Sequence, residues 1–257
     1  MKSKPRGIAL IINNEVFSCR SETEKENLDS RHGSEKDVKA LKMLFEKLYF
    51  KVTVKRNLGR EAILKVLDQV ANEDHSAHDC FVLCIMSHGL EGLFFGSDGE
   101  TLPYETVFDI FSNSSCRTLR GKPKLIFIQA CRGEDRQTGV VKDAPLLPDP
   151  RSLAVTTVGA ANKQWKFKFK EAIPDKSDML VAYSTVNGYV SYRDYHYGSR
   201  FVRCLVEVFK EKAGHENVLD MLTMVNDRLS KMGDIGKKQI GQPHFTLTKK
   251  LFFWPGL

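Results

Sequence analysis

Hydrophobic and polar positions along the chain follow two patterns: short apolar runs, and longer stretches in which apolar residues recur every three or four positions. The apolar runs are rich in β-branched residues and predict buried strands, which cover residues 7–13, 49–54, 80–86, 124–128 and 179–184. The amphipathic stretches predict helices, which cover residues 38–48, 63–70, 104–111, 201–209 and 218–229. Because strands and helices alternate, we predict an α/β fold with a mainly parallel sheet and right-handed crossovers.

Three further segments complete this pattern. Residues 92–99 are rich in glycine and predict a small hairpin, and residues 245–253 predict a last strand. Between residues 134 and 175 the pattern dissolves, and this stretch holds several prolines. A structureless stretch of this length inside a compact domain is usually functional or disordered.

Composition narrows the class of protein. The chain has 257 residues, of which 42% are hydrophobic and 28% charged, enough for one large α/β domain or two small ones. No apolar run is long enough to cross a membrane, and the first residues lack the apolar core of a signal peptide, so we expect a cytoplasmic protein. Six scattered cysteines without a Cys-x-x-Cys pair indicate reduced thiols.

The net charge of +7 has two interpretations, a nucleic-acid partner or a solvated surface. Because the 39 basic residues are mixed with 32 acidic ones, we favour the second and expect no nucleic-acid partner. Residues 163–170 alternate aromatic and basic side chains, which would suit nucleic acid or an anionic membrane surface. The same alternation is typical of an edge strand protected by lysines, and we therefore expect no membrane partner either.

Two strands end on residues that carry chemistry. Cys131 follows the strand at 124–128, and His88 follows the strand at 80–86. Because the carboxyl ends of parallel strands meet at one edge, the two side chains suit a cysteine nucleophile with a histidine acid/base. The alternatives are an inert core thiol and an ordinary turn histidine. Cys80 and Cys84 with His88 also have a spacing that would suit zinc, but the strand would turn the cysteines into the core, so we expect no metal.

The pentapeptide Gln129-Ala130-Cys131-Arg132-Gly133, with a histidine 43 residues upstream, resembles the caspase signature. The resemblance covers residues 7–253 and is most similar to an executioner-type caspase. It implies a three-layer α/β sandwich in which a roughly six-stranded, mainly parallel sheet lies between helices. It also implies one catalytic domain over residues 1–257 that needs no cofactor.

The same resemblance implies a zymogen. The linker at 134–175 would be cut after Asp143, which separates a large subunit of about residues 1–143 from a small subunit of 144–257. Asp149 is a poorer site because Pro150 follows it. The alternative is a loop that is never cut.

Catalytic roles come from the resemblance as well. Cys131 would attack the peptide carbonyl, and His88 would protonate the leaving amine and then activate water. The backbone N–H groups of Gly89 and Cys131 would stabilise the oxyanion. The resemblance requires no third side chain.

The substrate pocket is implied by position. Arg31 and Arg193 match the residues that hold the substrate aspartate, and the guanidinium fork suits a carboxylate. Gln129 matches the third member of this pocket and Ser87 its wall. We expect cleavage after Asp, with Glu poorer because its extra methylene displaces the carboxylate, and Arg193 would also bind the substrate backbone.

Ser191 and Tyr192 complete the predicted substrate-binding residues. Tyr192 stands where executioner-type caspases usually carry Trp, a change that resembles initiators, and Arg200 replaces another aromatic residue. We therefore do not carry over the family's preference for the substrate residue four positions before the cut.

Homodimerisation is implied through residues 242–245. Pro243 cannot donate a strand hydrogen bond, and a histidine at 244 would gain charge below about pH 6.5. We therefore expect the dimer to weaken in acid.

The predicted function is a cysteine endopeptidase that cleaves proteins after Asp and executes or relays apoptosis. One alternative is a catalytically silent signalling scaffold, which would usually lack Cys131 or His88. A second is a protease that cleaves after Arg or Lys, which would need acidic residues in the pocket. A third is a nucleic-acid module, which would need a clustered basic face.

Overall fold

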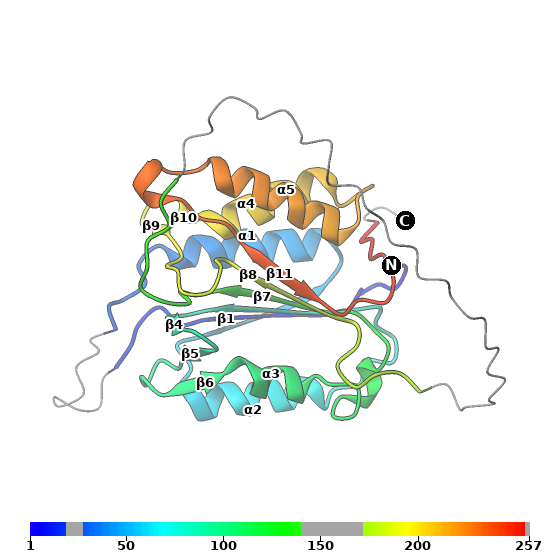
Figure 1. Ribbon diagram of the computed structural model, residues 1–257. Coiled ribbons are helices and arrows are strands. Elements are labelled where there is room, and N and C mark those ends of the chain that lie inside the picture. The colour runs from blue at the N-terminus through cyan, green and yellow to red at the C-terminus, as the bar shows by residue number, and fades with distance from the viewer. Residues whose placement is uncertain (19–27, 140–171, 255–257) are drawn as a thin grey trace, which may run out of the picture.

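The computed structural model describes residues 1–18, 28–139 and 172–254, and its centre is a six-stranded sheet (Figure 1). The strands run in the order β11-β8-β7-β3-β1-β2. Their bounds are β1 Ile8–Asn13, β2 Lys51–Arg56, β3 Phe81–Met86, β7 Lys124–Gln129, β8 Met179–Tyr183 and β11 Gln242–Phe245. All neighbours pair in parallel except β11, which pairs antiparallel with β8. The predicted mainly parallel sheet is confirmed.

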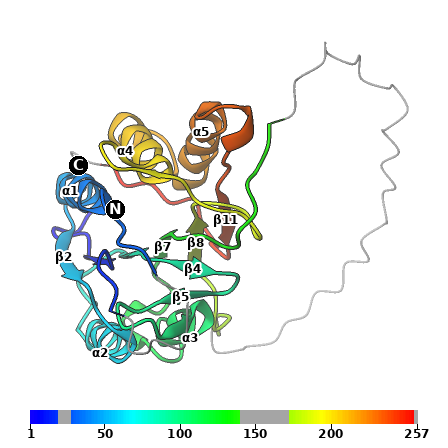
Figure 2. The same ribbon diagram turned by 90° about the vertical axis from the view of Figure 1, so that its left-hand side faces the viewer.

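Helices cover both faces of this sheet. One face carries α1 (Ser34–Lys47), α4 (Arg200–Lys212) and α5 (Val218–Lys231), and the other carries α2 (Arg60–Ala71) and α3 (Tyr104–Ile110). Figure 2, a view turned by 90°, shows β2 and β11 at opposite edges between the two helical layers. The three-layer sandwich predicted from the sequence is therefore confirmed.

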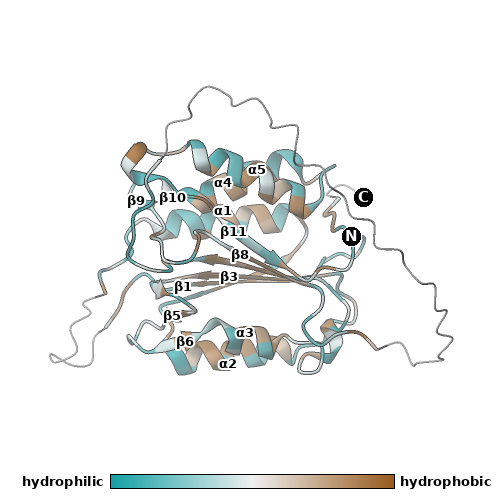
Figure 3. Cartoon of the chain, viewed as in Figure 1, coloured by the Kyte–Doolittle hydropathy of each residue, from teal (hydrophilic) through white to brown (hydrophobic). Residues whose placement is uncertain are grey.

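Alternate residues of the strands serve two cores. In β1, Ala9 and Ile11 face the cluster under α1, α4 and α5, whereas Ile8, Leu10 and Ile12 face the cluster above α2 and α3. Every residue of β1, β3 and β7 is buried. A strand covered on both faces needs apolar residues at consecutive positions, which is why these strands appear as continuous apolar runs (Figure 3).

The small elements lie at the end of the sheet where the parallel strands finish (Figure 1). A three-stranded sheet consists of β4 (Gly89–Leu90), β5 (Leu93–Phe95) and β6 (Thr101–Pro103). The hairpin predicted at 92–99 corresponds to β5 and the turn that follows, and its second strand, β6, lies beyond the predicted bound. A second hairpin, β9 (Arg193–Asp194) with β10 (Gly198–Ser199), was not predicted because two-residue strands have no hydrophobic pattern.

One predicted element is wrong. The last strand ends at Phe245, before most of the predicted stretch 245–253, where Phe252 makes only an isolated bridge to Asn217. Leu251 and Phe253 are nevertheless buried in the larger core cluster. Apolar residues that pack individually into the core therefore produced the same hydrophobic pattern as a strand.

Several predictions lie outside the described residues. Residues 140–171 include Asp143 and the aromatic–basic stretch at 163–170, so the division into subunits stays a prediction. Among the helices of the described segments, none combines the length and the apolar character required to cross a bilayer.

Candidate active site

The carboxyl ends of β3 and β7 lie side by side and hold the predicted thiol and imidazole. Met86 and Gln129 are register partners, so the segments that carry His88 and Cys131 leave the sheet next to each other. Both side chains line one cavity of about 280 Å³. The other residues that line it are Arg31, Ser87, Gln129, Ala130, Ser191, Tyr192 and Arg193. Every side chain predicted to take part in catalysis or substrate binding therefore reaches this cavity.

Cys131 differs from the other described cysteines in its surroundings. Its side chain is half-buried and lines the cavity, and the Ser191 N–H group donates to its sulfur at 3.4 Å. Burial raises the thiol pKa of Cys80, Cys84 and Cys204, all of which lie in the core. Cys131 is thus placed for chemistry, whereas these three thiols are kept protonated.

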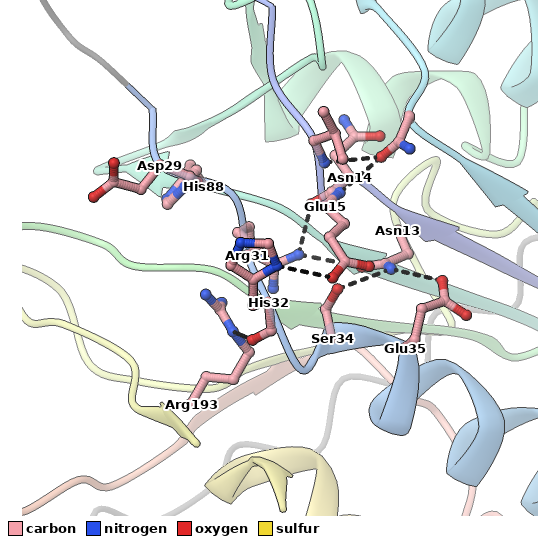
Figure 4. Close-up of polar contacts among 12 residues, drawn as sticks. Asn13, Asn14, Glu15, Asp29, Arg31, His32, Ser34, Glu35, His88 and Arg193 are labelled. Carbon is pink, nitrogen blue, oxygen red and sulfur yellow. Dashed lines mark hydrogen bonds and ion pairs between the residues drawn. The ribbon is translucent and has the colours of Figure 1, made fainter. Parts of the chain in front are cut away.

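His88 is oriented by a backbone carbonyl. Its Nε2 lies 2.7 Å from the carbonyl oxygen of Asp29 (Figure 4). The ring centroid of Phe17 is 4.9 Å from that of the imidazole. Since a carbonyl can only accept, Nε2 carries the proton and Nδ1 is the basic nitrogen of the neutral ring. Burial lowers the pKa of His88, with smaller contributions in the same direction from Arg31 and Arg193, so the ring is neutral at pH 7.

Gly89 allows the backbone after His88 to approach the thiol segment. A Cβ atom at this position would lie 3.0 Å from the Cys131 carbonyl oxygen and 2.9 Å from that of Leu93. Such spacing is tighter than ordinary side-chain contacts. The absence of a side chain at Gly89 therefore lets the backbone after His88 lie against the segment that carries Cys131.

Arg31 is a buried cation in the cavity wall. It is 1% exposed, and its Nη1 donates to the Asn14 carbonyl at 2.8 Å and to Asn13 Oδ1 at 3.2 Å (Figure 4). Within the described segments its Nη2 is buried and has no hydrogen-bond partner. Burial, and next the charge of Arg193, lower the pKa of Arg31 to about 9, which still leaves it charged at pH 7.

Arg193 is the second cation of this cavity. It belongs to β9, and its Nε donates to the His32 carbonyl at 3.0 Å (Figure 4). Burial lowers its pKa, and the nearby carboxylate of Asp37 acts in the opposite direction. Two arginines from distant parts of the chain therefore line one small cavity, and each carries an energetic cost from burial that an anionic ligand would offset.

The side-chain amides of Gln129 and Gln239 hold the segment of Ser191 and Tyr192, which directly precedes Arg193. Gln129 Nε2 donates to Ser191 Oγ at 2.8 Å, and Gln239 Nε2 donates to the same oxygen at 3.1 Å. Gln239 Oε1 accepts from the Tyr192 N–H group at 3.0 Å. The Tyr192 ring also stacks on the guanidinium of Arg200, 4.6 Å from the ring centroid.

Sequence reasoning missed several residues of the site. The Asp29 carbonyl and Gln239 were not identified, and neither was the role of Arg132, which donates to Gln242 in β11 and lies over the Tyr183 ring at 4.0 Å. A backbone carbonyl has no sequence signal, and single buried polar residues outside a motif resemble any other polar residue. Of these three residues, only Arg132 belongs to a sequence motif, the pentapeptide at residues 129–133.

The zinc interpretation finds no support in the geometry. Cys80 and Cys84 lie in the core cluster, away from the cavity that His88 lines. Across residues 1–18, 28–139 and 172–254, no three His, Cys, Asp or Glu side chains are grouped so as to hold a metal ion.

The fold and the cavity together define an α/β protein with a cysteine–histidine pair beside a cationic pocket. Comparison with known proteins gives the same class: a family model described as Caspase domain matches residues 6–252. The chain belongs to the caspase family.

Individual relatives resemble the chain over nearly its whole length. Caspase-8 of Mus musculus is 36% identical over 99% of this chain, caspase-9 of Homo sapiens 37% over 98%, and caspase-7 of Gallus gallus 36% over 98%. The aligned regions cover 52%, 62% and 79% of those proteins. The chain thus spans about half the length of the caspase-8 relatives it matches.

Proposed function

We propose that this protein is a cysteine endopeptidase that cleaves substrates after Asp and executes or relays apoptosis. The observation that carries this proposal is that one cavity is lined by Cys131, His88 and two arginines. Membership of the caspase family supports it.

The cavity suits a two-step acyl transfer. The Cys131 sulfur forms a bond to the substrate carbonyl carbon while His88 takes the thiol proton, and the backbone near Gly89 binds the oxyanion. Collapse of this intermediate breaks the C–N bond, and His88 gives its proton to the departing amine. Water, deprotonated by His88, then attacks the thioester, which releases the acid product and restores the thiol.

The pocket chemistry favours an acidic residue before the cut. Arg31 Nη2 is a buried donor without a partner in the described part of the chain, and a substrate carboxylate would give it one. Gln129 Oε1 is likewise buried and unpartnered there. A half-turn of this amide would let its oxygen accept from the Ser191 hydroxyl and would aim its NH₂ group at the same carboxylate.

The remaining parts of the proposal rest on family resemblance. The chain would be an executioner-type zymogen in the cytoplasm, activated by a cut after Asp143, and would form a homodimer through β11 (Gln242–Phe245). The retention of Cys131 and His88 in one cavity favours the enzyme over a silent scaffold. The two arginines disfavour a protease for Lys or Arg.

Peptide turnover tests the proposal directly. Matched peptides ending in Asp, Glu, Lys or Arg should be compared, with Cys131→Ala as the inactive control. We expect Asp to be cleaved best, and Lys and Arg to be disfavoured by on the order of 10⁴-fold. Efficient turnover of Lys or Arg would refute the pocket assignment, and turnover of none of the peptides by a folded protein would favour the scaffold.

A further inference from the structure

A buried carboxylate lies behind the two arginines. Asp37, in the first turn of α1, is 2% exposed, and both of its oxygens accept hydrogen bonds from one residue. Ser199 N–H donates to Oδ1 at 2.8 Å, and the Ser199 hydroxyl donates to Oδ2 at 2.5 Å. Burial raises the pKa of Asp37, while these two bonds and the charges of Arg31 and Arg193 act against that change.

The bonds from Ser199 act on the short hairpin that carries Arg193. In the β9–β10 pair, Ser199 is the register partner of Arg193. Each strand has only two residues, and such a hairpin has no stability of its own in water. Its position must therefore come from contacts outside the hairpin, and Asp37 provides two of them directly opposite the arginine.

Two glycines make this contact possible. Gly198 has a φ of +79°, and a Cβ atom there would overlap Asp37 Oδ1. Gly33 has a φ of +90°, and a Cβ atom there would lie 2.7 Å from the Asp194 carbonyl oxygen. The hairpin is thus seated directly on the segment between Arg31 and the start of α1. Asp37 therefore ties together the two segments that carry the arginines.

We infer that Asp37 is a positioning residue that fixes Arg193 relative to Arg31 and thereby sets the selectivity for Asp over Glu at the cleavage site. This inference rests on the proposed function. The physical reason is that two guanidinium groups discriminate between carboxylates one methylene apart only if their separation is fixed. A hairpin free to shift would accept both lengths.

Asp37→Ala and Asp37→Asn separate the contact from the side-chain volume. The asparagine oxygen can accept from Ser199 N–H and its NH₂ group can donate to Ser199 Oγ, so Asn keeps both bonds, whereas Ala keeps neither. Glu46→Gln is the matched control, because Glu46 is an exposed acid of the same helix whose carboxylate pairs with the exposed Lys42. For each variant, kcat and KM are measured with peptides that differ only in Asp or Glu before the cut.

We expect Asp37→Ala to lower kcat/KM for the Asp peptide by about 100-fold, mainly through KM, and to reduce the Asp-to-Glu ratio. Asp37→Asn should retain the wild-type ratio, as should Glu46→Gln. The rate at which iodoacetamide alkylates Cys131 should not change, since the hydrogen bond to its sulfur comes from Ser191, which lies outside the hairpin. If Asp37→Ala does not fold, Ser199→Ala, which removes only the hydroxyl bond, should give a smaller loss of the same ratio.

An unchanged Asp-to-Glu ratio in Asp37→Ala, with activity reduced only in proportion to the folded fraction, would show a purely structural role and overturn the inference. Equal loss of the ratio in Asp37→Asn and Asp37→Ala would overturn the contact as its cause. The wild-type arm separates this failure from that of the proposed function, because a wild-type protein that does not cleave the Asp peptide refutes the function itself.

Discussion

Replacing Arg31 with lysine tests whether the buried guanidinium recognises the substrate carboxylate. Lysine keeps the positive charge but offers a point charge in place of a planar fork. Arg31 uses Nη1 for the Asn13 and Asn14 oxygens, and its buried Nη2 has no partner in the described segments. A single ammonium group cannot reproduce both the structural bonds and a directed bond to the ligand.

The magnitude follows from the bond that is lost. A hydrogen bond to a charged group contributes a net 1.5–3 kcal/mol, roughly. Because about 1.4 kcal/mol corresponds to a factor of ten, Arg31→Lys should lower kcat/KM for an Asp peptide by roughly 10- to 150-fold. The loss should be much smaller for a peptide with Asn before the cut, since a neutral amide gains less from the fork.

The assay is the ratio of kcat/KM for matched Asp and Asn peptides, which does not depend on the fraction of folded enzyme. Arg56→Lys serves as the control. Arg56 pairs with a carboxylate, that of Glu35, as Arg31 is proposed to do with the substrate, but the Arg56–Glu35 pair lies at the surface. Exposed pairs contribute at most about 1 kcal/mol to stability, and this variant should leave the ratio unchanged. A wild-type ratio in Arg31→Lys would refute the assigned role.

Two further predictions follow from the site. Because burial lowers the pKa of His88, the acid limb of the kcat/KM profile should have its midpoint below pH 6.5. The profile is measured from pH 4.5 to 8, and a midpoint above pH 6.5 would contradict the neutral ring. Gly198→Ala should lower the free energy of unfolding by ~1–3 kcal/mol, because the residue has a positive φ and faces Asp37; denaturation showing no loss would contradict this contact.

The sheet and the cysteine–histidine pair could be predicted from the sequence because their signals are local. β1, β3 and β7 are buried along their full length, and the candidate catalytic residues His88 and Cys131 follow closely after β3 and β7. The same reasoning failed at residues 245–253, where Leu251 and Phe253 enter the core without a strand partner of the predicted length. Hydrophobicity reports burial, and it indicates a strand only where a neighbour is available for pairing.

The missing parts of the pocket have long-range causes. Asp37 directly precedes the predicted helix at 38–48, and in the structure it lies in the first turn of α1, where acids are common for a different reason, the helix dipole. Its role depends on Ser199, 162 residues away in the chain. No local pattern encodes such a pair, so the pocket arginines could be assigned by resemblance while the residue that holds one of them could not.

This long-range construction bears on a cut in the linker. The segments on either side of residues 140–171 share the parallel β7–β8 pair, in which five register partners join Lys124–Gln129 to Met179–Tyr183. They are joined again at the site, where Ser199 bonds Asp37 and Arg193 bonds the His32 carbonyl. Since none of these contacts requires a continuous chain through the linker, a cut there would leave the sheet and the two-arginine pocket held together. Each subunit alone would carry only one of the two arginines, so separation of the subunits would abolish the pocket.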